Sequence, residues 1–402
     1  MIMKWIVIPI ILVSISMSAQ SPHSAEYYFE KGEESLKRKS YRTALAHFNE
    51  CLRINPFYYE AYYSRGLARE NMGDKQGALT DFNIYLESKP EDKEALFSRA
   101  VGRYNFGQWA MAKEDFIALL KLPEGGETNT VYFQDNISSE GQTKVLTAHH
   151  GLKPILHNYL GLIETKLQEY ARAIPHYDSA IHLDPDNADY YLNRGLAYQL
   201  MRDTANALKD YDRVLKVDPT NNLAQHNLAV LNQNRDKDRA EVLLTEAIAA
   251  NPSLPYSYAE RGSLRMREGN LKGALNDYNQ AIKLDATEPD YWLNRGLIKE
   301  QLKDVTGALS DYSQVIRLKP DYEKAWLNHG NALVKQNKLT EAIEDYTAAI
   351  TYYPEYGLAF YNRSIAYFRL GKKELACTDL KQAQGLGVIV DAAMKSKVCS
   401  HE

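Results

Sequence analysis

Residues 289–322 read PDYWLNRGLIKEQLKDVTGALSDYSQVIRLKPDY, and this stretch of 34 residues decides the fold of the chain. Apolar and small residues recur in it at helical spacing in two runs, the first around Gly296 and the second from Ala308 to Ile316. A polar break at Lys303–Asp304 separates the runs, and Pro320 closes the second. The pattern predicts two short helices joined by a turn.

Ten copies of this unit can be laid end to end along the chain. The eighth position of a copy is small, as it must be where two helices cross closely: Gly32, Gly66, Ala100, Gly161, Gly195, Ala229, Gly262, Gly296, Gly330 and Ser364. The twentieth position is alanine in every copy: Ala44, Ala78, Ala112, Ala173, Ala207, Ala240, Ala274, Ala308, Ala342 and Ala376.

This arrangement resembles the tetratricopeptide repeat, whose pattern runs from an aromatic residue through Leu-Gly, Ala and a second aromatic residue to Pro. The resemblance implies an all-α fold, a right-handed superhelical solenoid of about ten helix–turn–helix repeats that bury their apolar faces on one another. We expect repeats 1–3 over residues 25–123, repeats 4–10 over residues 154–390, and a C-terminal capping helix over residues 391–402.

Residues 124–153 interrupt the array. Two runs rich in β-branched and aromatic residues, TNTVYFQ (128–134) and QTKVLTA (142–148), flank a polar middle and predict an inserted β-hairpin, with a disordered loop as the alternative. His149, His150 and His157 lie near its exit, but no Cys or carboxylate joins them at a recognised metal-ligand spacing. We therefore expect no metal site and no cofactor.

Six copies carry Arg at the seventh position and Asp at the twenty-third, whereas copies with Lys or Leu at the seventh have no Asp at the twenty-third. The two positions face each other on antiparallel helices, and the planar fork of Arg can bind a carboxylate through two parallel hydrogen bonds. We predict structural ion pairs within the repeats, rather than a ladder of ligand-binding arginines. The pairs are Arg65–Asp81, Arg99–Asp115, Arg194–Asp210, Arg261–Asp277, Arg295–Asp311 and Arg363–Asp379.

The family resemblance also implies that the first helices of the repeats line a concave groove in which partners bind. The sixth position, which faces this groove, is Asn193, Asn227, Asn294, Asn328 and Asn362 in five of the later copies. A row of amides can hydrogen-bond the backbone of an extended peptide, so we predict that these residues bind one. In the N-terminal repeats Phe29, Tyr63 and Phe97 form an aromatic row that could anchor an apolar ligand; packing against the neighbouring repeat is the alternative.

The N-terminus has the pattern of a targeting segment. Lys4 precedes an apolar run from Trp5 to Val13, and the small residues Ser16, Ser18 and Ala19 follow. We predict a signal peptide over residues 1–19 and a periplasmic or secreted protein with no integral membrane segment after cleavage. A retained anchor is the alternative, although the run is shorter than the roughly 20 residues that a spanning helix needs.

Export makes the cysteines informative, because an oxidising compartment favours disulfides. Cys377 and Cys399 flank Gly385 and Gly387, so a helix that ends there and a second one that returns would bring the two thiols together. We predict a structural disulfide between them, with two unpaired thiols as the alternative. Cys51 is expected to be a buried thiol.

Composition and motifs bound the function. The net charge is −4 without a block of one sign, which disfavours nucleic acid as the partner. No phosphate loop, nucleophile elbow or metalloprotease motif is found, and we predict that the chain is not an enzyme. The leading hypothesis is a non-catalytic scaffold of the cell envelope or secreted space that binds a peptide or protein in the groove. The alternatives are a regulatory, receptor-like module, whose groove is gated by residues 124–153 and takes a small ligand or peptide, and a structural element without a discrete partner.

Overall fold

The computed structural model describes residues 24–123, 131–134, 143–146 and 151–399 of the 402-residue chain. The chain divides into two compact units, Met1–Pro185 and Asp186–Glu402. The predicted signal peptide, residues 1–19, lies outside the described residues.

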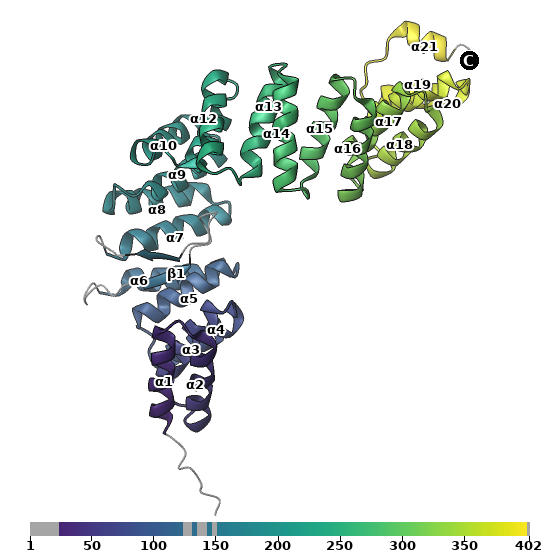
Figure 1. Ribbon diagram of the computed structural model, residues 1–402. Coiled ribbons are helices and arrows are strands. Elements are labelled where there is room, and N and C mark those ends of the chain that lie inside the picture. Colours follow the sequence, from purple (N-terminus) through teal and green to yellow (C-terminus); the bar gives the residue numbers. More distant parts are fainter. Residues whose placement is uncertain (1–23, 124–130, 135–142, 147–150, 400–402) are drawn as a thin grey trace, which may run out of the picture. The chain divides into compact units, whose positions relative to one another are not determined.

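The first unit is a stack of four helical hairpins, drawn from purple to blue in Figure 1. Its helices are α1 (Ala25–Lys37), α2 (Tyr41–Ile54), α3 (Tyr59–Asn71), α4 (Lys75–Ser88), α5 (Lys93–Asn105), α6 (Trp109–Lys121), α7 (Lys153–Lys166) and α8 (Tyr170–Leu183).

The second unit stacks six further hairpins and ends in a short helix. Its helices are α9 (Ala188–Leu200), α10 (Thr204–Val217), α11 (Asn222–Asn232), α12 (Lys237–Ala250), α13 (Pro255–Arg267), α14 (Leu271–Leu284), α15 (Pro289–Gln301), α16 (Val305–Leu318), α17 (Glu323–Lys335), α18 (Leu339–Tyr352), α19 (Gly357–Arg369), α20 (Lys373–Gly385) and α21 (Ala392–Val398).

Each hairpin is held together where a small residue of its first helix meets a buried ring or aliphatic side chain of its second. In the hairpin α15–α16, Gly296 faces Tyr312, and a Cβ atom on Gly296 would lie only 2.5 Å from Cε1 of that ring. Tyr312 and Ala308 are fully buried. The second helix of a hairpin then packs on the first helix of the next, as α16 does on α17. The predicted all-α architecture of stacked helix–turn–helix repeats is therefore confirmed.

The turn inside most hairpins passes through one residue with a left-handed backbone. Gly73 occupies this position with φ of +83°, whereas Lys303 occupies it with φ of +70° despite its side chain. The following residue commonly caps the second helix, as Asp304 does by accepting a hydrogen bond from the backbone N–H of Gly307. The turn residues thus determine where one helix ends and the next begins.

Two strands lie within the interval 124–153. β1 (Val131–Gln134) and β2 (Thr143–Leu146) pair antiparallel, with Val131 opposite Leu146 and Gln134 opposite Thr143. The other residues of the predicted hairpin, 124–130, 135–142 and 147–150, lie outside the described residues. Helices α6 and α7, which precede and follow the interval, contact each other. The stacking of hairpins in the first unit therefore continues past the insertion.

A disulfide closes the C-terminal end of the second unit. It joins Cys377 of α20 to Cys399, which follows α21, with a Cα–Cα distance of 5.1 Å. Val398 is 1% exposed and packs in one apolar cluster with Leu380. The short helix α21 is thereby held against the last repeat. Cys51 is buried, and burial raises the pKa of its thiol to about 11.

Candidate peptide-binding face

The five predicted groove asparagines lie on successive first helices of the second unit, α9, α11, α15, α17 and α19, with α13 carrying Glu260 at this position. All five side chains are half-buried. We call the surface formed by these residues the asparagine face. Because each side chain leaves the same position of its repeat, the amides recur at regular intervals along the stack.

The asparagines differ in how their amides are engaged. Asn362 donates to Oδ1 of Asn331 at 2.8 Å, and that oxygen also accepts from the hydroxyl of Tyr346. Asn227 lies close to the hydroxyl of Tyr211, which itself donates to Gln199. Asn294 and Asn328, in contrast, have no hydrogen-bond partner within the described residues. These two neighbouring repeats therefore present amide donors and acceptors that the fold does not use.

Carboxylates and tyrosines surround this part of the asparagine face. The hydroxyl of Tyr322 donates to Oδ1 of Asp290 at 2.5 Å. Burial, together with the nearby carboxylates of Glu288, Asp285, Glu260 and Asp290, raises the pKa of Tyr291 to about 12. The face around α15 therefore carries carboxylates beside aromatic rings, a combination that favours positively charged side chains.

The aromatic row predicted in the first unit is mainly packing, and Phe97 is a correction to the predicted ligand anchor. Its side chain is 1% exposed, and its ring centroid lies 6.2 Å from that of Phe116. Phe29 is half-buried, with its ring 4.8 Å from Tyr58, and the ring of Tyr63 lies 5.2 Å from Tyr85. Phe97 is therefore a core residue, whereas Phe29 and Tyr63 pack on neighbouring rings and keep part of their surface exposed.

The structure brings all six arginine–aspartate pairs together. In each pair Nη2 of the arginine donates to Oδ1 of the aspartate at 2.7–2.9 Å, and Nε donates to Oδ2 at 2.7–3.1 Å. All six carboxylates are buried. The alternative of free, ligand-binding arginines is therefore wrong: their planar forks are occupied within the fold.

The arginines also link neighbouring repeats, which the sequence analysis missed. Nη1 of Arg295 donates to Oδ1 of Asn279, on the second helix of the preceding repeat, at 2.9 Å. Arg65, Arg99, Arg261 and Arg363 make the corresponding bond to Asn49, Asn83, Thr245 and Thr347. A single guanidinium thus joins its own hairpin to the one before it.

A second cation was also missed in four repeats. Lys299 Nζ lies 2.8 Å from Oδ2 of Asp311, and Arg69, Arg103 and Arg265 reach their aspartates in the same way. Each follows the pairing arginine by four residues, one helical turn later. The sequence did contain a signal, because a basic residue occurs at this position only in copies that carry the aspartate.

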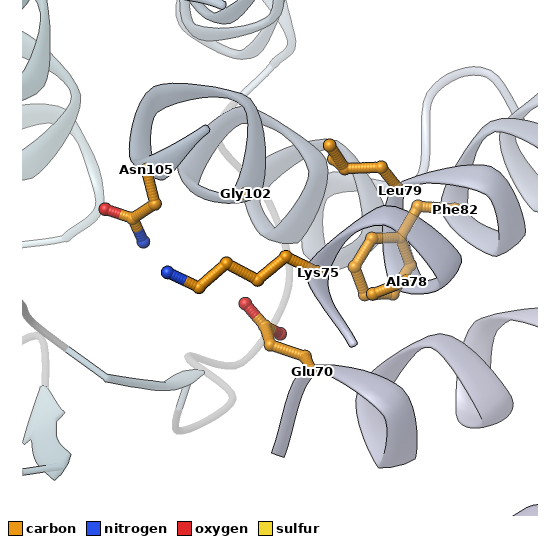
Figure 2. Close-up of a pocket in the computed structure, with 7 residues that line it drawn as sticks. All are labelled: Glu70, Lys75, Ala78, Leu79, Phe82, Gly102 and Asn105. Carbon is orange, nitrogen blue, oxygen red and sulfur yellow. The ribbon is translucent and has the colours of Figure 1, made fainter. Parts of the chain in front are cut away.

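The first unit contains a small pocket between α3, α4 and α5 (Figure 2). It is lined by apolar residues, among them Leu79, Phe82 and Gly102, and by the polar side chains of Glu70, Lys75 and Asn105. The half-buried carboxyl group of Glu70 has no hydrogen-bond partner within the described part of the chain. Burial raises the pKa of Glu70 to about 7, against the opposing effect of Lys75.

Two repeat positions explain this pocket. At the position of Gly102 every other repeat except the first carries an apolar residue, such as Ile163 or Leu264. At the position of Phe82 the later repeats mostly carry tyrosine, and in α16 the hydroxyl of Tyr312 donates to Glu300, the counterpart of Glu70. The absence of a side chain at Gly102 leaves the hollow. The absence of a hydroxyl on Phe82 leaves the carboxyl group of Glu70 without a hydrogen-bond donor.

No helix among the described residues is long and apolar enough to cross a membrane.

Comparison with known proteins supports the repeat assignment over most of the chain. Sequence models described as "TPR repeat" match residues 161–201, 262–303 and 330–371, and models described as "Tetratricopeptide repeat" match residues 29–93, 188–221 and 289–322. The mitochondrial import receptor subunit TOM70 of Homo sapiens is 25% identical over 124 residues, which are 31% of this chain and 15% of that protein. An uncharacterized protein of Methanocaldococcus jannaschii is 41% identical over 44 residues, 11% of this chain and 51% of that protein.

Solved structures agree on the fold. The C-terminal part of a TPR repeat-containing protein from Cytophaga hutchinsonii has a TM-score of 0.50 and 17% sequence identity, and covers 59% of this chain and 97% of its own. At that identity the likeness concerns the fold alone. The repeat matches and the hairpins described above establish that the chain belongs to the tetratricopeptide repeat family.

Proposed function

We propose that this protein is a non-catalytic interaction scaffold that binds an extended segment of a protein partner on the asparagine face. The observation that carries the proposal is the pair of unengaged amides on Asn294 and Asn328. A half-buried amide without a partner loses hydrogen bonds to water without full compensation, and a peptide backbone alongside it can supply both donor and acceptor. The carboxylates near α15 favour a segment with net positive charge.

The test is cross-linking of the protein in cells that produce it, followed by mass spectrometry. We expect one reproducible partner linked to residues between 193 and 362. In the double variant Asn294→Ala/Asn328→Ala the affinity of a peptide spanning the cross-linked segment should fall about 10-fold or more, because two amide hydrogen bonds are worth about 1.4 kcal/mol or more together.

The matched control is Asn276→Ala, which removes an exposed amide from a second helix, α14. Its affinity for the same peptide should equal that of the wild type. Cross-links confined to the second helices, or equal affinity of the double variant and the wild type, would overturn the proposal.

We further propose that the protein works in the periplasm or outside the cell, after removal of residues 1–19. Two observations support this: the charged, apolar and small-residue order of the N-terminus, and the disulfide between Cys377 and Cys399. N-terminal sequencing of the protein purified from the envelope and culture medium of the producing cells tests it. A chain that begins at Gln20 is expected, whereas recovery of only the uncleaved chain from the cytoplasm would contradict it.

A further inference from the structure

The fourth repeat replaces a structural group that most other repeats share. In five other repeats the fourth, seventh and twenty-third positions form a stack of aromatic ring, arginine and aspartate, as in Trp292, Arg295 and Asp311, where the guanidinium lies 4.7 Å from the ring centroid. In the fourth repeat the same positions hold His157, Leu160 and His176. Without a cation at the middle position, this repeat places two imidazoles opposite each other.

The two imidazole rings face each other with their Nδ1 atoms. Nδ1 of His157, on α7, lies 3.3 Å from Nδ1 of His176, on α8, and the ring planes are inclined by 35°. Both side chains are half-buried, so solvent and small ions can reach them. At 3.3 Å the pair is long for a strong hydrogen bond, whose donor–acceptor distance is usually near 3 Å.

The separation does fit two ligands of one metal ion. Zinc binds histidine nitrogen at about 2.0–2.1 Å, and two such bonds at a tetrahedral angle place the nitrogens about 3.3 Å apart. A hydrogen bond between the rings needs one protonated and one unprotonated Nδ1, whereas a metal ion needs a lone pair on both, so the same geometry serves either state.

Two lysines and one carboxylate lie near the half-buried rings. Burial, the facing ring of His176 and the cation of Lys153 all lower the pKa of His157. Burial also lowers the pKa of His176, with Lys113 acting in the same direction and Glu164 opposing both. Lys113 and Glu164 form an ion pair with an Nζ–Oε1 distance of 2.5 Å.

Glu164 adds a second observation at this site. Its side chain is buried, and Oε2 has no hydrogen-bond partner among the described residues. Glu164 lies close enough to His176 to influence its titration, so a cation bound between the histidines would have near it a carboxylate oxygen that lacks a hydrogen-bond partner.

We propose that His157 and His176 form a binding site for a single divalent transition-metal ion of the zinc, copper or nickel class, with water completing its coordination. Imidazole nitrogen is a preferred ligand of these ions. No third His, Cys, Asp or Glu of the described residues is placed to complete the site, so these residues supply two ligands. In sequence His157 lies near His149 and His150, which predicts no metal site, whereas the fold places it beside His176.

Isothermal titration of the whole metal-free protein with Zn²⁺, near neutral pH, tests the proposal. We expect one saturable equivalent in the wild type and loss of that step in both His157→Gln and His176→Gln. The matched control is His226→Gln, which removes another half-buried imidazole in the second unit and should leave the step unchanged. The absence of a saturable step in the wild type would overturn the proposal, as would a step retained in both glutamine variants.

A spectroscopic measurement keeps the test decisive if a variant folds poorly. With Cu²⁺ at less than one equivalent, the ring resonances of His157 and His176 in the wild type should broaden before those of other histidines. The electron paramagnetic resonance spectrum should show coupling to two ring nitrogens. Earlier broadening of His149 and His150, with His157 and His176 unaffected, would place the metal elsewhere and refute the site.

Discussion

Lys299 places its Nζ 2.8 Å from Oδ2 of Asp311, a buried carboxylate that also accepts two hydrogen bonds from Arg295. One buried negative charge therefore has two cations, of which only Arg295 reaches across to the preceding repeat. Losing one partner leaves the charge compensated, whereas losing both leaves it buried and alone.

We expect this arrangement to make the two cations strongly non-additive. Arg295→Ala should lower the free energy of unfolding by about 1–2 kcal/mol, since Lys299 still pairs with Asp311. Arg295→Ala/Lys299→Met should cost about 3–5 kcal/mol, because Asp311 is then unpaired. Urea denaturation of the wild type, both single variants and the double variant measures the coupling.

Replacing the whole set by apolar residues is the control. Arg295→Leu/Lys299→Met/Asp311→Leu removes the buried charge together with its partners, and should be more stable than Arg295→Ala/Lys299→Met. Simple addition of the single-variant effects, or a triple variant less stable than the double variant, would contradict the assignment of Lys299 as the second partner.

Two glycines on first helices should respond in opposite directions to the same substitution. A Cβ atom on Gly296 would lie 2.5 Å from the fully buried ring of Tyr312, so Gly296→Ala should destabilise the protein by about 1–3 kcal/mol. A Cβ atom on Gly102 would lie 3.0 Å from the end of the Leu79 side chain, at the edge of the pocket. That side chain can shift, so Gly102→Ala should stabilise the protein by up to about 1 kcal/mol through helix propensity.

The two variants serve as controls for each other, since both exchange helical glycine for alanine. Thermal melting measured side by side is sufficient. A lower melting temperature for Gly102→Ala would mean that the Leu79 side chain cannot shift. An unchanged melting temperature for Gly296→Ala would mean that the Tyr312 ring can shift to accommodate the added methyl group.

The disulfide between Cys377 and Cys399 should contribute measurably to stability. It closes a loop with a sequence separation of 22 residues and restricts the unfolded chain, which reduces the entropy gained on unfolding by an amount equivalent to about 3 kcal/mol. Cys377→Ser/Cys399→Ser should therefore melt at a lower temperature and expose α20 and α21 to faster amide exchange. Reductant should lower the melting temperature of the wild type and leave that of the variant unchanged.

Thiol titration measures the number of free cysteines. The denatured, unreduced wild type should show one reactive thiol, that of Cys51, which the structure leaves unpaired. Three reactive thiols, or equal melting of variant and wild type, would be evidence against a structural role for the disulfide.

The hairpins and their ion pairs could be predicted because the repeats provide an internal alignment. Arg295 and Asp311 occupy positions that vary together across ten copies, and antiparallel helices place them opposite each other. The disulfide could be predicted because Gly385 and Gly387 mark where the chain turns back between Cys377 and Cys399.

What could not be predicted depends on side-chain direction rather than on spacing. Phe97 shares the repeat position of two half-buried rings, but its own ring packs against Phe116 and Tyr159 and is buried. Histidines lie near His157 in sequence, but its neighbour in space, His176, comes from the opposite helix of the hairpin. The pocket beside Glu70 could not be predicted, because it depends on a side chain that Gly102 lacks and a hydroxyl that Phe82 lacks, both of which most later repeats carry.

Glu70 should make stability fall as the pH rises, the reverse of the usual behaviour of a carboxylate. Its pKa is about 7 in the folded protein, against 4.5 for the ordinary side chain, so between these values the unfolded chain has released a proton that the folded chain retains. Unfolding then becomes easier with increasing pH, and the effect levels off above about pH 7.

Glu70→Gln removes this titration and leaves a neutral side chain of similar size. The variant and the wild type should melt alike near pH 4, where the carboxyl group is neutral in both states. Near pH 8 the variant should be more stable by about 1–2 kcal/mol, which allows for the partial exposure of the group. Glu87→Gln, at an exposed position of α4, is the control and should show no such divergence between pH 4 and pH 8. If Glu70→Gln parallels the wild type across this range, the carboxyl group is ionised in the folded protein and Lys75 or solvent compensates it.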